Sequence, residues 1–287
     1  MKIGFIGAGK VGHSLGKYFA EKRVALSGYF SRTLNSAEEA ARFTNSQAFS
    51  SPLPLFESSD LIFLTVPDGA IGPVWENLKQ SLQETLQSSA IKDTILGHCS
   101  GSLSSDIFEK AKDLGFEVIS LHPLMAIPDK LESYKLLSKA VFSIEGTPRA
   151  VETVSNMINS LGNQTHVLHK DQKTLYHCAA SFVSNFGVAL AQIGAEMFKS
   201  CGLEAATPAL FQLMLANANS IAQYGPVHAL TGPIERGDEK TIAAHLRALK
   251  GQEKEVYRLL GQKLVEISKV KHPEKDYGPL LKVLNEA

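Results

Sequence analysis

The chain has 287 residues, more than the roughly 100–200 of a typical domain, so we expect two domains. Hydrophobic residues make up 44% and charged residues 20%, and 29 basic residues balance 29 acidic ones. This neutral balance argues against nucleic acid or a membrane surface as the main partner. The three cysteines, Cys99, Cys178 and Cys201, lack the spacing of a metal site or a disulfide framework. We therefore expect no bound metal and, because neither a signal peptide nor an apolar run of transmembrane length is evident, a cytoplasmic protein.

Residues 1–168 alternate between short apolar runs and amphipathic stretches. The apolar runs predict strands at Lys2–Gly7, Val24–Ser31, Asp60–Pro67, Thr94–Ser100, Val118–Leu124, Ala140–Glu145 and Thr165–Leu168. The stretches between them predict helices at Val11–Lys22, Ser36–Phe43, Ile71–Leu82, Ser105–Leu114 and Arg149–Leu161, with Ser36 and Glu39 as a capping box. This order predicts an α/β fold, a Rossmann-type doubly wound and mostly parallel sheet.

Residues 169–287 show no strand pattern and predict an all-helical domain. Tyr176–Cys201 is expected to be one long helix, and its middle is apolar nearly all round, which predicts burial. Further helices are expected at Thr207–Tyr224, Thr241–Leu249 and Glu253–Val270, with a short one at the end of the chain. The apolar surface of the long helix and its successor predicts a homodimer built on this C-terminal domain.

The first predicted strand runs directly into a glycine-rich motif, Gly7-Ala8-Gly9-Lys10-Val11-Gly12. GxGxxG is a weak signal alone, but between a strand and a helix it is the fingerprint of a dinucleotide site. The first glycine permits the turn, the second lets the backbone approach the pyrophosphate, and the third lets the helix pack against the strand. The alternative is a glycine-rich turn that binds nothing.

The end of the second predicted strand selects the nucleotide. NAD enzymes usually carry an acidic residue there for the ribose hydroxyl, whereas this chain has Ser31-Arg32-Thr33. Arg32 can pair with a 2′-phosphate, and the two hydroxyls can donate hydrogen bonds to it. We therefore predict NADP(H) as the cofactor; the other interpretation of Arg32 is a solvated surface side chain.

Polar residues follow the later predicted strands, where ligands bind in open α/β sheets. Thr65-Val66-Pro67 and Ser100 are expected to line the cofactor, and Ser100, Gly101 and His122 the substrate. Ser100 and Gly101 also precede a predicted helix start, a second candidate anion site. His98 is equally consistent with a core histidine.

Four polar residues spaced by four, Lys173, His177, Ser181 and Asn185, would form one stripe along the long helix. If the stripe faces the nicotinamide, Lys173, His177 or His122 is the proton donor, with His177 favoured. Ser181 and Asn185 would then hold the reacting group of the substrate. An internal hydrogen-bond network is the alternative. In the loop Leu230–Asp238, Arg236 could bind a substrate carboxylate, although a plain surface loop is equally consistent.

The combination resembles the group that contains pyrroline-5-carboxylate reductase, ketopantoate reductase and the 6-phosphogluconate and 3-hydroxyacid dehydrogenases. More closely it is similar to Rossmann-like proteins with a C-terminal domain of unknown function 2520. The segments that carry this resemblance are His98–Ser105, Leu121–Leu124, Tyr176–Asn185 and Thr231–Asp238. The dehydrogenases place asparagine four residues after a catalytic lysine, whereas here His177 follows Lys173, which leaves the proton donor open.

The resemblance implies an NADPH-dependent oxidoreductase that reduces the carbonyl group of a small carboxylate, with 2-ketopantoate first. A cyclic imine acid such as pyrroline-5-carboxylate is the alternative substrate. A non-catalytic NADP-binding sensor or regulatory protein is the alternative from another class.

Overall fold

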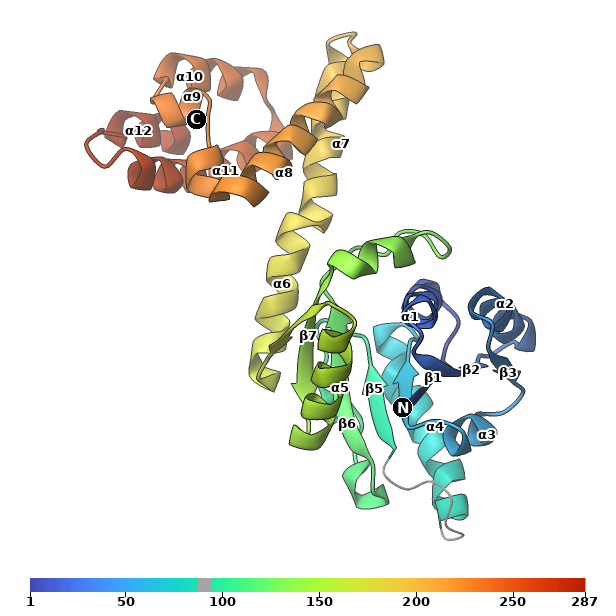
Figure 1. Ribbon diagram of the computed structural model, residues 1–287. Helices are drawn as coiled ribbons and strands as arrows, with labels where there is room; N and C mark the ends of the chain where they lie inside the picture. Colours follow the sequence, from blue (N-terminus) through green and yellow to red (C-terminus); the bar gives the residue numbers. More distant parts are fainter. Residues whose placement is uncertain (87–93, 287) are drawn as a thin grey trace. The chain divides into compact units, whose positions relative to one another are not determined.

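The computed structural model describes residues 1–86 and 94–286 (Figure 1). The chain forms two compact units, Met1–Ser184 and Asn185–Ala287. The first unit holds the whole sheet and one helix beyond it, so the division between units falls one helix after the predicted boundary at 168/169. The added helix stays with the first unit because Lys173 in its first turn bonds to the strand ends, as described below.

An eight-stranded sheet forms the centre of the first unit, in the order β3-β2-β1-β4-β5-β6-β7-β8. The strands are β1 (Lys2–Ile6), β2 (Ala25–Phe30), β3 (Gln47–Phe49), β4 (Leu61–Leu64), β5 (Ile95–His98), β6 (Glu117–Pro123), β7 (Val141–Gly146) and β8 (Gln164–Val167). All pairs are parallel except β6 with β7. The predicted Rossmann-type sheet is confirmed, and β3, too short to show a pattern in the sequence, is an addition.

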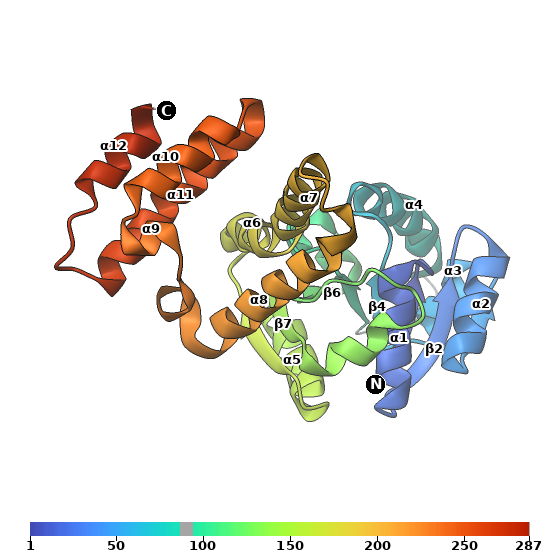
Figure 2. The ribbon, with the colours of Figure 1, turned by 90° about the horizontal axis from the view of Figure 1, so that it is seen from above.

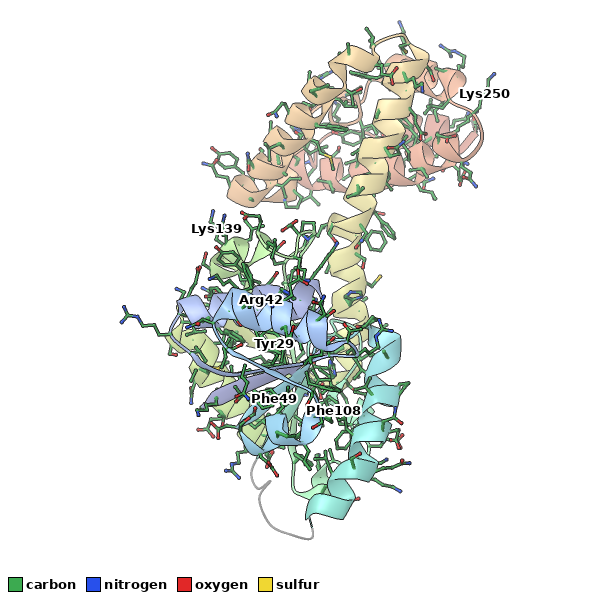
Figure 3. All side chains as sticks on the ribbon, turned by 90° about the vertical axis from the view of Figure 1, so that its right-hand side faces the viewer. Tyr29, Arg42, Phe49, Phe108, Lys139 and Lys250 are labelled. Carbon is green, nitrogen blue, oxygen red and sulfur yellow. The ribbon has the colours of Figure 1, made fainter. Side chains whose placement is uncertain are left out.

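Helices cover both faces of the sheet (Figures 1 and 2). One face packs on α1 (Lys10–Glu21), α2 (Leu34–Thr44), α5 (Pro148–Ser160) and the 3₁₀ segment η3 (Ser133–Lys139). The other packs on α3 (Pro52–Glu57) and α4 (Asp68–Leu86). Tyr29, Phe49 and Phe108 are buried in these layers, whereas Arg42 and Lys139 are exposed (Figure 3).

Two helix predictions were wrong, one in its start and one in its type. Helix α2 begins at Leu34 and its N-cap is Thr33, whose hydroxyl accepts the N–H of Ser36, so Ser36 does not form the predicted capping box. The predicted helix Ser105–Leu114 consists of two 3₁₀ turns, η1 (Ser105–Ile107) and η2 (Lys112–Leu114). The buried Glu145 carboxylate accepts both the N–H and the hydroxyl of Ser105, at 2.7 and 2.8 Å.

The end of the first unit and the beginning of the second are helical. Helix α6 (Lys173–Val183), preceded by the 3₁₀ turn η4 (Lys170–Gln172), ends at Ser184, and α7 (Asn185–Ser200) follows. The predicted single helix is therefore two. Its apolar residues were predicted to be buried, but Val183 and Val188 are 84% and 71% exposed. The run Lys170–Ser200 is also long and apolar enough to cross a membrane on length and composition, contrary to the expectation that no run reaches that length.

The second unit is helical throughout its described residues, as predicted. After the 3₁₀ turn η5 (Glu204–Ala206) come α8 (Thr207–Ala229), α9 (Pro233–Arg236), α10 (Glu239–Ala248), α11 (Gly251–Lys271) and α12 (Gly278–Glu286). Helix α8 kinks at Gly225, where φ is 77°. Ile234, Ile242, Leu246, Val265 and Leu284 are among the residues of its small core.

Candidate functional site

The glycine motif forms the turn between β1 and α1. Gly7 has a φ of 108°, a left-handed conformation that favours glycine, and its N–H donates to Phe30 O. A Cβ at Gly12 would lie 2.6 Å from both Gly7 O and Thr65 Oγ1, so only glycine lets α1 approach the turn. At Gly9, the N-cap of α1, a Cβ would find no neighbour closer than 3.8 Å. The backbone there is open to a ligand, and the first turn of α1 begins at Lys10 and Val11 with its N–H groups directed at it.

The residues after β4 complete this turn. Thr65 donates its hydroxyl to Gly7 O at 2.8 Å, and Val66 Cγ1 lies 3.0 Å from where a Gly7 Cβ would be. The Thr65 hydroxyl is therefore engaged in holding the glycine turn, rather than presented to a ligand. Pro67 leads into α4, whose first residue is Asp68.

The three residues predicted to bind the nucleotide at the end of β2 differ in whether their side chains are available to a ligand. Ser31 is half-buried, and Thr33 is committed to capping α2. The Arg32 guanidinium is exposed and forms no hydrogen bond or ion pair within residues 1–86 and 94–286. Of these three residues, Arg32 is thus the one whose hydrogen-bond donors are all available to bind a phosphate.

Asp68 connects the cofactor turn to the end of β5. Its carboxylate accepts the hydroxyls of Ser100 and Ser102, at 2.6 and 3.2 Å. The Ser100 hydroxyl in turn accepts the N–H groups of Ser102 and Leu103. Those N–H groups are therefore used within the loop. Because no α-helix follows, the second anion site predicted at Ser100 and Gly101 is not formed.

Lys173 is 1% exposed and reaches from α6 to the ends of β5 and β6. Its ammonium donates to Ser120 Oγ at 2.6 Å and to Ser100 O at 3.1 Å. Burial lowers its pKa, an effect that the charge of Glu145 opposes. Lys173 thus anchors α6 to the sheet, with two of its three donors already engaged.

Two histidines meet over Gly101. A Cβ added to Gly101 would lie 2.5 Å from Cδ2 of His177 and 2.9 Å from Nε2 of His122, and the two ring centroids are 6.0 Å apart. Nδ1 of His122 is 3.0 Å from the Tyr176 hydroxyl. Burial, followed by the positive charge of Lys173, lowers the pKa of His122 to about 4, so its imidazole is neutral at pH 7.

His98 is a core histidine, which is one of the two interpretations that the sequence allowed. It is fully buried; its Nδ1 accepts the N–H of Ser100, and its Nε2 bonds to Ser104 O. Burial lowers its pKa to about 4. With both nitrogens engaged, His98 closes the loop that carries Ser100 and Gly101.

The predicted polar stripe is interrupted. Lys173, His177 and Ser181 lie on α6, but Asn185 begins α7 in the second unit. The Ser181 hydroxyl donates to His177 O within its own helix. Arg236, at the end of α9, is exposed, and its guanidinium forms no hydrogen bond or ion pair within the described part of the chain.

The loop around Arg236 is nevertheless well braced inside the second unit. Glu235 bonds His272 at 2.6 Å, and its backbone oxygen accepts the Tyr277 hydroxyl. Asp238 caps α10 by accepting the N–H of Thr241.

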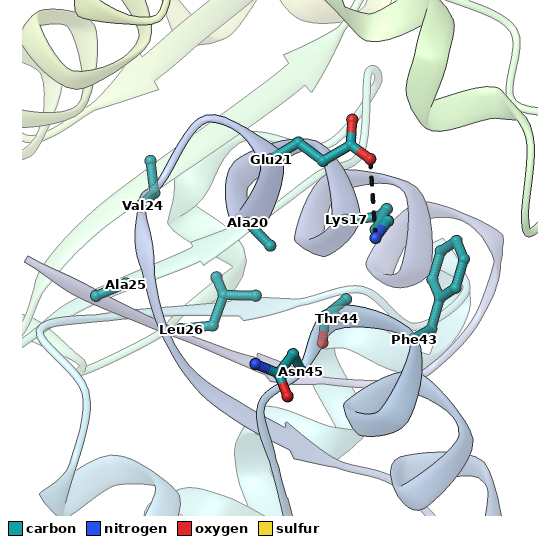
Figure 4. Close-up of a pocket in the computed structure, with 9 residues that line it drawn as sticks. All are labelled: Lys17, Ala20, Glu21, Val24, Ala25, Leu26, Phe43, Thr44 and Asn45. Carbon is teal, nitrogen blue, oxygen red and sulfur yellow. Dashed lines mark ion pairs between the residues drawn. The ribbon is translucent and has the colours of Figure 1, made fainter.

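A hollow of about 400 Å³ lies elsewhere on the first unit (Figure 4). Its lining comes from the last turns of α1 and α2 and the start of β2, and it includes the Lys17–Glu21 ion pair. This is the amino end of the parallel strands, opposite the glycine turn. Ligands of doubly wound sheets bind at the carboxyl ends, so this hollow is not the candidate site.

Residues 2–90 match the family described as NADP oxidoreductase, coenzyme F420-dependent, and residues 140–264 match the domain of unknown function DUF2520. The chain is a Rossmann-like protein with a DUF2520 region. That region begins at β7, within the sheet, and not at the start of the helical unit. No protein of curated function matches the chain in sequence.

Solved structures support the same fold over nearly the whole chain. A Thermotoga maritima protein is 26% identical with a TM-score of 0.74, covering 94% of this chain and 99% of its own. An imine reductase from Myxococcus stipitatus in complex with NADP⁺ is 18% identical with a TM-score of 0.62, covering 99% and 100%. A Plasmodium falciparum pyrroline carboxylate reductase with NADP bound is 17% identical with a TM-score of 0.56, covering 94% and 96%.

The family match and the glycine turn agree on the cofactor and the chemistry. NADP(H) is the cofactor of this Rossmann-like protein, as predicted from Arg32, and the protein is an NAD(P)-dependent oxidoreductase. The prediction missed Ser120, Tyr176 and Glu145, which the structure brings to the ends of β5 and β6. Asp68, which follows the end of β4 in the sequence and was therefore expected near the crevice, bonds Ser100 there.

We expect Arg32→Asp to reverse the preference for NADPH over NADH. A charge-assisted contact to the 2′-phosphate contributes about 1.5–3 kcal/mol, or roughly 10- to 150-fold in affinity. Fluorescence titration of both cofactors measures the change. Arg42→Asp, at the other end of α2, should leave the preference unaltered. Equal affinities of the unaltered protein for NADPH and NADH would contradict the role of Arg32.

Proposed function

We propose that the protein is an NADPH-dependent reductase of the C=N bond of a small cyclic imine carboxylic acid. The observation that carries the proposal is the pair His122 and His177 over Gly101. Ser100, next to Gly101, donates to Asp68, and Thr65, three residues before Asp68, donates to Gly7 O in the glycine turn. This arrangement offers one neutral imidazole and one further imidazole at the carboxyl ends of the strands. Relatives over 94–99% of this chain include an imine reductase and a pyrroline carboxylate reductase, and both have been solved with NADP.

In the proposed reaction NADPH supplies the hydride to the imine carbon. His177 delivers the proton to the imine nitrogen, because its imidazole lies beside Gly101 and a histidine ring nitrogen can carry and donate a proton. Lys173 is not assigned as the direct donor, since its ammonium is buried and already bonds Ser120 and Ser100.

Two other functions are distinguished by one set of assays. A 2-oxo acid such as 2-ketopantoate would use the same groups, but neither NADP-bound relative described above is a 2-oxo acid reductase. We expect NADPH oxidation with 1-pyrroline carboxylates at a kcat/KM at least tenfold above that with 2-oxo acids. The reverse order would replace the imine by the 2-oxo acid. Tight NADPH binding without turnover of either class would favour a sensor.

We also propose that the protein is a homodimer through its second unit. Val188 on α7 and Leu213 and Leu215 on α8 are 71%, 60% and 54% exposed within the chain, which is a large apolar surface for a monomer. Val188→Asp with Leu213→Asp should give a monomer at micromolar concentration by light scattering, because each buried side chain contributes about 1.5–3 kcal/mol. Leu131→Asp, an exposed leucine of the first unit, is the control and should stay dimeric. A monomeric unaltered protein would refute the proposal.

A further inference from the structure

Two side chains of α6 reach the end of β6 together. Lys173 and Tyr176 are one helical turn apart, and their partners Ser120 and His122 are two residues apart on one face of the strand. The Tyr176 ring stands edge-on to the imidazole, with centroids 5.7 Å apart and planes at 88°. The His122–Tyr176 contact is thus part of the docking of α6 on the sheet, and the orientation of the imidazole depends on it.

The chemistry of the two groups sets the direction of this hydrogen bond. A phenol O–H is far more acidic than a neutral imidazole N–H, and an imidazole nitrogen is a better acceptor than a phenol oxygen. Tyr176 therefore donates to Nδ1 of His122. The imidazole proton is then on Nε2, the nitrogen that lies over Gly101.

The charged groups around His122 keep it neutral. Lys173 and His177 face it from α6, Asp68 from α4 and His98 from β5. Burial and the Lys173 ammonium disfavour a second positive charge, and Asp68 opposes this effect only in part, so the pKa of His122 is lowered to about 4. A neutral imidazole with a fixed proton is a hydrogen-bond donor that does not give up its proton.

We propose that Tyr176 is a positioning residue that holds His122 as a neutral imidazole with its Nε2–H directed over Gly101, where it donates to an acceptor atom of the substrate. The substrate part rests on the proposed function, whereas the state of the imidazole does not. The two histidines then have different roles: His122 orients the substrate, and His177 donates the proton to it.

The state of the imidazole can be measured without any substrate. In protein labelled with ¹⁵N-histidine, the His122 signals are those missing from His122→Gln. At pH 7 we expect the Nε2–H tautomer in the unaltered protein and a mixture of tautomers in Tyr176→Phe. Tyr257→Phe is the matched control, because its hydroxyl also contacts a histidine Nδ1, that of His245, at 2.8 Å. An Nδ1–H tautomer, an imidazolium at pH 7, or no change in Tyr176→Phe would overturn the proposal.

A double-mutant cycle tests whether Tyr176 acts on the substrate through His122. Tyr176→Phe should lower kcat/KM about 5- to 10-fold, mainly through KM, as loss of one oriented hydrogen bond predicts. In the His122→Gln background, where an amide N–H replaces Nε2–H without needing Tyr176, the same change should alter kcat/KM less than twofold. An equal loss in both backgrounds would show that Tyr176 acts by another route. Absence of turnover in every variant, with the expected tautomers, would refute the proposed function alone.

Discussion

His177→Ala is expected to lower turnover about 10²–10⁴-fold while NADPH affinity stays close to that of the unaltered protein. Reduction of a polar double bond places a lone pair on its nitrogen or oxygen, and a positioned donor must supply the proton. His177 meets this requirement because its Cδ2 edge lies beside Gly101 and its ring faces His122 at 6.0 Å. The residues predicted to bind the cofactor, Gly7–Gly12 and Arg32, belong to other elements.

The measurement is steady-state NADPH oxidation combined with NADPH titration by fluorescence. The pH profile adds a second readout, through the titration of the neighbouring His122. His122, with a pKa of about 4, should affect only the acidic end, where its protonation would remove the neutral donor. His166→Ala, an exposed histidine on β8, is the control. Full turnover of His177→Ala would mean that another group donates the proton, and would refute the assignment of His177 as the proton donor.

Gly101→Ala is expected to lower kcat/KM about 100-fold, the loss typical of a displacement of roughly 1 Å at a reacting centre. The new methyl carbon would lie 2.5 Å from His177 Cδ2 and 2.9 Å from His122 Nε2, so one or both rings must move. His122 cannot turn away freely, because Tyr176 holds its Nδ1. The backbone of Gly101 is not left-handed, so alanine adds no strain of its own.

A matched control separates this effect from a general cost of adding a methyl group. Gly72→Ala, on α4, would place its Cβ no closer than 3.7 Å to any neighbour and should retain activity. Thermal unfolding should show both variants folded, and NADPH titration should show the cofactor bound. Wild-type kcat/KM in Gly101→Ala would mean that the two rings are not in the reacting geometry, and would count against both the proposed function and the role of Gly101.

Much of the cofactor half was predictable from local pattern. The GxGxxG motif and Arg32 are read from a few adjacent residues, and the predicted strands agree with β1, β2 and β4–β8. At β1 and β4 the agreement arises because buried parallel strands are continuous apolar runs. Local pattern failed where a distant side chain intervened. Residues 105–114 have a helical pattern, but Glu145, 40 residues away, takes the N–H and hydroxyl of Ser105.

The sequence by itself determined the Rossmann-type sheet, the helical C-terminal unit and the NADP(H) cofactor, since each depends on periodicity or on a contiguous motif. Only the tertiary structure decided which polar residues meet. Lys173, expected in the cleft, is buried against Ser120 and Ser100, while Tyr176 contacts His122 across 54 positions in the chain. Spacing on one helix sets which side chains share a face, but not which strand ends that face meets. The protonation and orientation of His122 follow from burial and from its neighbours, and those exist only after the chain has folded.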